Sequence, residues 1–431
     1  MKRDTSTYER VMFFNARQKP MYFAFHLKVR GAVGADELRK SLATVRPFYP
    51  LSSVRVGFGP GKSHWVTTEG VPEYPVAVLE QNAQWRAVVS EMLIEKWDET
   101  KGPMVKFALI PGDEQTELLA LFHHAVCDGI SALYFLKDLY CVLNGEPVAG
   151  LESRGVDRWE PILTEAVTED VRKEFEESEP PVWLKHKLHL QMEMKPCPEF
   201  HFLQPSFDIR SIELDEGETE SVARRAKEWD VSVHSYLGAV MLSVFARRFA
   251  RSTGYERIIQ SPLSFRHFLR QEYRETFGIF MGIMKETVDC GPERSLKEIA
   301  SQIHSGFRRQ IDSTEKLMMY LNFMTHMLKE IDDPEAFWYS SPRHDFMDYD
   351  FSLSNLGRID FPDKKRKLLE LHGPIFSAVD GERIFGVNTT NGRMAITMIY
   401  DSNCFWGEWA EELFGSIEDM LRVKEMAGVG K

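Results

Sequence analysis

The chain has 431 residues, 43% of them hydrophobic, so it can bury a large core and exceeds the length at which one core usually stops growing. Its formal net charge of −12 argues against a nucleic-acid binder, because phosphate affinity comes mainly from Lys and Arg. The five cysteines are scattered without a C-x-x-C pair, and no apolar run approaches the roughly 20 residues that span a membrane. We therefore expect a cytoplasmic protein with reduced thiols and two domains.

The first part of the chain predicts strands mixed with helices around one sheet. Residues 21–30 alternate apolar side chains with others, which is the period of a half-buried strand. The predicted elements, in order, are this strand, a helix from Asp36 to Pro47, a helix at 85–97, strands at 104–110 and 118–124, and a helix at 130–143.

This alternation of predicted strands and helices stops at about residue 147 and resumes at Ile209. We predict one half at residues 1–165, a partly helical connection at 166–205, and a second half at 206–431. The elements expected in the second half are a helix around 236–245, strands at 258–263 and 277–288, a hairpin of 385–389 with 394–399 around Asn391-Gly392, and a helix at 406–423.

The densest chemical signal is the run LLALFHHAVCDG at residues 118–129. Because a strand alternates its side chains between two faces, His123 and His124 must point in opposite directions. One of them is a candidate catalyst and the other packs. We interpret Cys127 as a small buried hydrophobe rather than a nucleophile.

Other motifs are weaker. A metal site at His123, His124 and Asp128 is disfavoured, because neighbouring strand histidines diverge and no further ligands cluster there. His344 to Asp348 also fits H-x-x-x-D but lacks the glycine, and the F-P-E-G segment of glycerolipid acyltransferases is missing. The chain has no G-x-S-x-G elbow, P-loop or G-x-G-x-x-G.

Residues 123–129 resemble the HHxxxDG signature of the chloramphenicol acetyltransferase-like superfamily, which includes condensation domains of peptide synthetases and plant BAHD acyltransferases. Further segments resemble the superfamily in the same order: 101–109, 262–266, 277–280, 354–357 and 392–401. Lys106 stands where an Arg is usual, and the DFGWG loop of the plant branch is absent. The chain looks nearest to stand-alone condensation-like or alcohol acetyltransferase-like members.

The resemblance implies an α/β fold of two acetyltransferase-like subdomains in a V shape, with a tunnel at their interface. It also implies an acyltransferase, typically of secondary metabolism, that moves an acyl group directly from a thioester to a hydroxyl or an amine. His124 would lie at mid-tunnel as the general base, because an imidazole with a pKa of about 6.5 can accept a proton near neutral pH.

For the neighbours of His124, the resemblance implies that Asp128 turns away from the tunnel and pairs with Arg266, and we expect Gly129 to allow a tight turn into the next helix. His123 is expected to support the site by packing or hydrogen bonding. Ser354 and Asn355 are candidate oxyanion or tunnel residues, although a plain turn role fits them equally well.

The expected co-substrate is an acyl-coenzyme A or a phosphopantetheine thioester, the latter on an acyl or peptidyl carrier protein, with no metal and no tightly bound cofactor. The basic residues 364–367 could meet such an anionic donor, but a solvated charge run is favoured. The Met- and Phe-rich stretch 317–324 could shape an apolar pocket, but helix core is favoured. We expect a free-standing protein, and the rival hypothesis is a non-catalytic module that binds a carrier protein or another partner.

Overall fold

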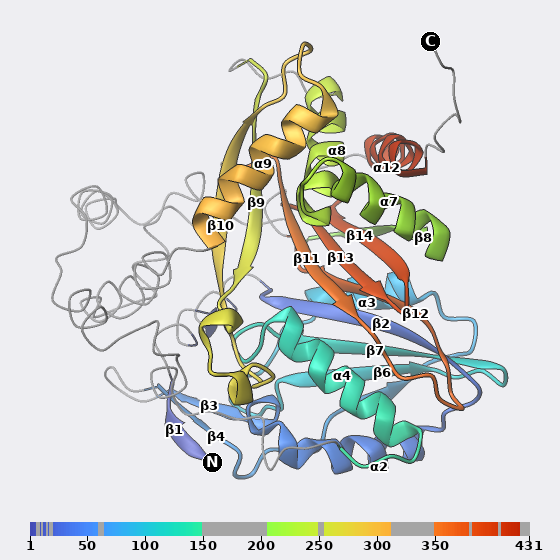
Figure 1. Ribbon diagram of the computed structural model, residues 1–431. Coiled ribbons are helices and arrows are strands. Elements are labelled where there is room, and N and C mark those ends of the chain that lie inside the picture. The colour runs from blue at the N-terminus through green and yellow to red at the C-terminus, as the bar shows by residue number, and fades with distance from the viewer. Residues whose placement is uncertain are drawn as a thin grey trace, which may run out of the picture.

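The computed structural model describes residues 1–5, 9, 12, 13, 16, 20–58, 64–148, 205–248, 254–311, 349–378, 382–403 and 407–422. Two large sheets, each covered by helices, form two α/β lobes that lie one above the other in Figure 1. The predicted α/β class with two subdomains is therefore confirmed. The predicted connection at 166–205 lies almost wholly outside the described residues, and the subdomain boundaries stay a prediction.

The first sheet has five strands in the order β12-β2-β7-β6-β5. Their bounds are Leu368–Phe376, Tyr22–Arg30, Gln115–His123, Val105–Ile110 and Val76–Val78. Helices α2 (Ala35–Val45) and α4 (Gly129–Leu143) share a hydrophobic core with one face of this sheet, and α3 (Trp85–Ile94) packs on the other. A separate small sheet consists of β1 (Lys2–Asp4), β4 (His64–Thr67) and β3 (Arg55–Phe58).

The expectation that β2 is half-buried was wrong. Tyr22, Ala24 and His26, the alternate residues expected to face solvent, are buried. Tyr22 and Ala24 belong to the core under α3, and this core also takes Ile209 and Ile399 from the second sheet. Both faces of β2 are therefore covered, one by its own subdomain's helices and the other where the two lobes meet.

The second sheet has six strands in the order β10-β9-β11-β13-β14-β8. Their bounds are Met281–Asp289, Glu256–Ser264, Phe351–Ile359, Arg383–Thr390, Arg393–Asp401 and Phe207–Leu214. The helices on it are α7 (Glu216–Glu228), α8 (Val233–Arg248), α9 (Leu296–Ile311) and α12 (Gly407–Arg422), and they share one core with the sheet. Short 3₁₀ turns lie at Arg46–Phe48, Pro50–Ser53, Arg266–Phe268 and Gln271–Tyr273.

The predicted hairpin is confirmed as β13 and β14. Asn391 and Gly392 have φ of 50° and 82°, the two left-handed positions that a tight hairpin turn requires. Helix α7 was missed, although its capping box of Asp215 and Glu218 is a readable start signal. Strand β12 was missed as well.

Strand β12 connects the two sheets. It follows β11 in the chain but pairs antiparallel with β2 in the first sheet. On its other side, Asn388 of β13 donates its side-chain amide to the carbonyls of Leu371 and Gly373 at 3.2 and 2.8 Å. A Cβ at Gly386 of β13 would overlap the carbonyl oxygen of Pro374. Only glycine lets β13 approach β12 this closely.

Gly386→Ala should therefore destabilise the protein by about 1 to 3 kcal/mol, because a backbone carbonyl cannot swing aside and the two strands must separate. Urea unfolding measures the change. Gly415→Ala is the matched control, since Gly415 lies in α12 with no atom near its missing Cβ, and it should raise stability by about 0.5 to 1 kcal/mol. Equal stability of Gly386→Ala and the parent would contradict the close approach.

Candidate active site

The two histidines of the motif lie where β7 ends and diverge as predicted. The His123 amide donates to the Met104 carbonyl at 3.0 Å, which keeps His123 in the sheet. The His124 amide donates to the Met21 carbonyl at 2.8 Å, just outside the paired part of β2. The rings then pack on different aromatic groups on the two sides of the sheet.

His124 is buried, and its ring is fixed by one hydrogen bond and two aromatic neighbours. Its Nδ1 lies 3.0 Å from the Cys127 carbonyl oxygen, and the rings of Phe23 and Phe376 lie 5.1 and 5.7 Å away. A carbonyl only accepts, so Nδ1 carries the hydrogen and Nε2 keeps its lone pair. No described residue hydrogen-bonds Nε2. Burial lowers the pKa of His124, which keeps the ring neutral.

His123 has the opposite arrangement. The Ala125 amide donates to its Nδ1 at 3.1 Å, so Nε2 carries the hydrogen and faces the Glu99 carboxylate at 3.4 Å. Its ring packs edge-on against Tyr22 and Trp97. Burial lowers the pKa of His123 too. With both nitrogens engaged, the ring has the packing and hydrogen-bonding surroundings expected of a supporting residue.

Asp128 and Arg266 form a buried ion pair across 138 residues of sequence. Arg266 Nη2 donates to both carboxylate oxygens of Asp128, at 3.0 and 3.1 Å. The backbone amides of Ser131 and Phe280 donate to the same carboxylate at 2.7 and 2.9 Å. Because Asp128 is the N-cap of α4, one carboxylate closes the helix start and holds the second subdomain against it.

Arg266 is held as firmly as its partner. Its Nη1 donates to the carbonyls of Arg274 and Thr276, both at 2.8 Å, and its Nη2 donates to the Ser131 hydroxyl at 2.6 Å. The Phe280 ring lies 4.8 Å from the guanidinium. Sequence reasoning missed Ser131 because a serine in the first turn of a helix has no distinctive pattern.

Gly129 has a different role from the one expected. It shows no left-handed φ, but a Cβ there would lie 3.0 Å from Leu356 Cδ2. The glycine therefore makes room for the Leu356 side chain, which comes from β11 of the second sheet, rather than permitting a tight turn.

Ser354 and Asn355 lie on the same strand, β11, just before Leu356. Ser354 is buried, whereas Asn355 is partly exposed and its Oδ1 accepts the Gly357 amide at 2.9 Å. This hydrogen bond is typical of a turn, which is the alternative role that the sequence analysis gave for Asn355. The next residue, Leu356, lies near Gly129 of the motif, and the oxyanion role of Ser354 and Asn355 stays a prediction.

The basic residues 364–367 are partly paired. Lys364 forms an ion pair with Glu146, and Arg366 forms one with Glu37 at 2.8 Å. These ion pairs hold the residues just before β12 against the first subdomain. Cys127 is fully buried in the core, and burial raises its pKa, as a packing role requires. The stretches 317–324 and 344–348 lie outside the described residues.

Comparison with known proteins shows what the chain resembles. Residues 204–399 match the model of the phthiocerol/phthiodiolone dimycocerosyl transferase C-terminus. A nonribosomal peptide synthetase of Aspergillus ustus is 25% identical over 168 residues, which are 37% of this chain and 4% of the synthetase. The chain thus spans only a small part of that relative's length.

Among solved structures, a trichothecene 15-O-acetyltransferase from Fusarium sporotrichioides has a TM-score of 0.67 at 13% identity, covering 97% of this chain and 94% of that one. The first condensation domain of the CDA synthetase gives 0.64 at 11%, covering 98% and 95%. Polyketide synthase associated protein 5 from Mycobacterium tuberculosis gives 0.61 at 14%, covering 97% and 98%. The chain therefore has the fold of these transferase and condensation domains. None of the helices that the structure describes has the length and apolar composition to cross a bilayer.

Asp128→Asn should destabilise the fold by about 3 to 5 kcal/mol, because Arg266 is left buried without its anionic partner. Urea unfolding of the purified variant measures the loss. Asp36→Asn is the control, since Asp36 pairs with Arg39 on the exposed face of α2, and it should change stability by less than about 1 kcal/mol. Similar small losses in both variants would show that the buried pair is dispensable.

Proposed function

We propose that the protein is an acyltransferase that moves an acyl group from a thioester to a hydroxyl or an amine, with His124 as the general base. The tautomer of His124 carries this proposal. The Nδ1 hydrogen is committed to the Cys127 carbonyl, so the lone pair on Nε2 is available for an incoming acceptor. The fold it shares with an acetyltransferase and a condensation domain supports the same reaction class.

The proposed reaction proceeds by direct attack. As the acceptor oxygen or nitrogen forms its bond to the thioester carbonyl carbon, Nε2 of His124 takes the acceptor's proton. The tetrahedral intermediate then breaks its carbon–sulfur bond, and the imidazolium returns the proton to the departing thiolate. The substrates would enter by the tunnel that the resemblance implies, as a coenzyme A ester or a carrier-bound thioester.

Stabilisation of the oxyanion would come from the second subdomain. Neighbouring strand residues face opposite ways, so one of the two, the Ser354 hydroxyl or the Asn355 side-chain amide, would be the donor; Asn355 uses only its oxygen in the bond to Gly357. Leu356, the next residue, packs beside Gly129 at the start of α4. Strand β11 is therefore the element of the second subdomain that we expect to stabilise the oxyanion in the transition state.

His124→Ala should lower the rate of thiol release from acyl thioesters by about 10²- to 10⁴-fold, which is the usual contribution of a general base. The assay offers acetyl- and longer acyl-coenzyme A, and acyl-pantetheine, with a panel of alcohols and amines. His304→Gln is the control, because His304 lies on α9 outside the site and should leave the rate unchanged. Equal thiol release by the parent and His124→Ala would sink the catalytic assignment and favour the binding module.

The pH dependence of kcat/KM offers a second test. Burial lowers the pKa of His124, so the neutral ring should persist below its ordinary titration range. The rate should therefore be flat through neutral pH and fall only below about pH 6.5, as Nε2 becomes protonated. An acid limb with its midpoint above pH 7 would contradict this environment for the base.

A further inference from the structure

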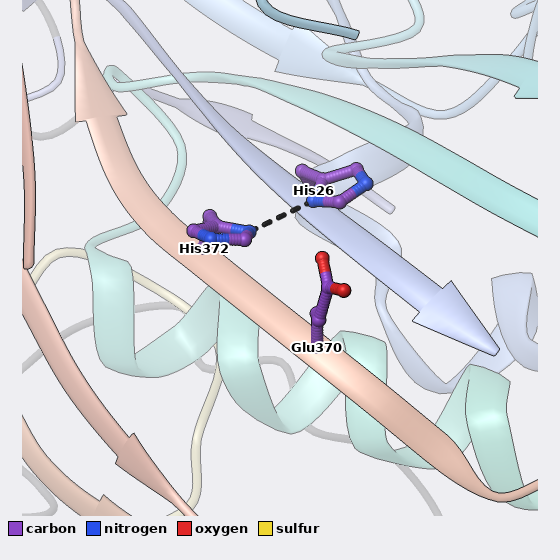
Figure 2. A group of neighbouring side chains, drawn as sticks. All are labelled: His26, Glu370 and His372. Carbon is purple, nitrogen blue, oxygen red and sulfur yellow. Dashed lines mark hydrogen bonds between the residues drawn. The ribbon is translucent and has the colours of Figure 1, made fainter. Parts of the chain in front are cut away.

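A second histidine pair lies in the first sheet, away from the HHxxxDG motif. His26 of β2 and His372 of β12 are direct partners in the strand register, and their Nδ1 atoms lie 2.9 Å apart. Both side chains are buried, and the indole of Trp85 stacks on both rings, with centroids at 4.4 and 5.0 Å. Figure 2 shows the two rings edge to edge, with Glu370 pointing toward the gap between them.

The outer nitrogens of both rings face carboxylates. His26 Nε2 lies 2.8 Å from Glu117 of β7, and His372 Nε2 lies 2.8 Å from Glu213 of β8. An ionised carboxylate only accepts hydrogen bonds, and both Nε2 atoms must therefore carry hydrogen.

With both hydrogens on Nε2, no hydrogen is left for the contact between the two Nδ1 atoms. A neutral imidazole carries one hydrogen, and in each ring it is used on Nε2. Two Nδ1 lone pairs then face each other across 2.9 Å in a buried place, which is repulsive. Either a further proton or a metal ion must lie between them.

We propose that His26, His372 and Glu370 bind a divalent transition-metal ion of the zinc class. Their ligand atoms lie within 4.8 Å of one another, and two imidazoles with one carboxylate are a common zinc ligand set. Around a tetrahedral ion with bonds of about 2.0 Å, two ligand nitrogens lie roughly 3.3 Å apart, so the rings need only a small separation.

The surroundings have the features that metal-binding histidines require. Glu117 and Glu213 accept the outer N–H groups, an arrangement that fixes ring orientation and strengthens the ligands. Glu370 now pairs with Lys28 at 3.1 Å on the partly exposed side of the cluster, and Lys28 would release it to the ion. Because Glu213 belongs to the second sheet, the ion would also tie β2 and β12 to the other lobe.

The test uses the full-length, tag-free protein treated with a chelator and then titrated with zinc chloride by calorimetry and with cobalt chloride by visible absorption. The parent should bind one more ion per chain than His372→Gln, with the visible bands of a low-coordinate cobalt centre. Glu370→Gln should weaken zinc binding at least tenfold. Glu114→Gln, an exposed glutamate on the turn between β6 and β7, is the matched control and should bind like the parent.

Thermal unfolding gives an independent readout, because an ion bound only by the folded chain raises Tm. Zinc should raise Tm of the parent and of Glu114→Gln, and it should raise Tm of Glu370→Gln less. If His372→Gln fails to fold, Glu370→Gln still decides, since this side chain is 30% exposed. Equal zinc binding by the parent and Glu370→Gln, or no binding by the parent, would overturn the metal site and leave a shared proton as the cation between the rings.

Discussion

The buried ion pair of Asp128 and Arg266 is the constraint on which the candidate site depends. A buried charge is costly unless it is paired and hydrogen-bonded, and here two backbone amides donate to Asp128 and two carbonyls accept from Arg266. Because Asp128 caps α4, the pair fixes where that helix begins. The turn before it then presents the Cys127 carbonyl that sets the tautomer of His124.

The two lobes share elements as well as contacts. Strand β12 comes from the second half of the sequence, completes the first sheet and supplies Phe376 to the ring of His124. Strand β11 of the second sheet sends Leu356 against Gly129 at the start of α4. His124 at this junction is therefore positioned by both subdomains, so a change at either side of the junction should affect the same imidazole.

The sequence predicted the features that depend only on neighbouring residues. The divergence of His123 and His124 follows from strand geometry, and the Asn391-Gly392 turn follows from two positive φ angles. The buried second face of β2 was not predictable, because its cover comes from α3 and from Ile209 and Ile399 in the second half of the chain. The pairing of Asp128 with Arg266 came only from a family resemblance. His26 and His372 are 346 residues apart and lie in no motif, so no sequence signal connected them.

Hydrogen-bond partners give the histidines of one sheet different chemistry. His124 has a carbonyl on Nδ1 and keeps a lone pair on Nε2, which suits a base. His123 has a donor on one nitrogen and a carboxylate on the other, which suits packing. His26 has a carboxylate on its outer nitrogen, as His372 does, and this turns both inner lone pairs toward a cation. Because the rings are buried, water cannot replace these hydrogen-bond partners. The partners around each ring, rather than the residue type, therefore decide what that histidine can do.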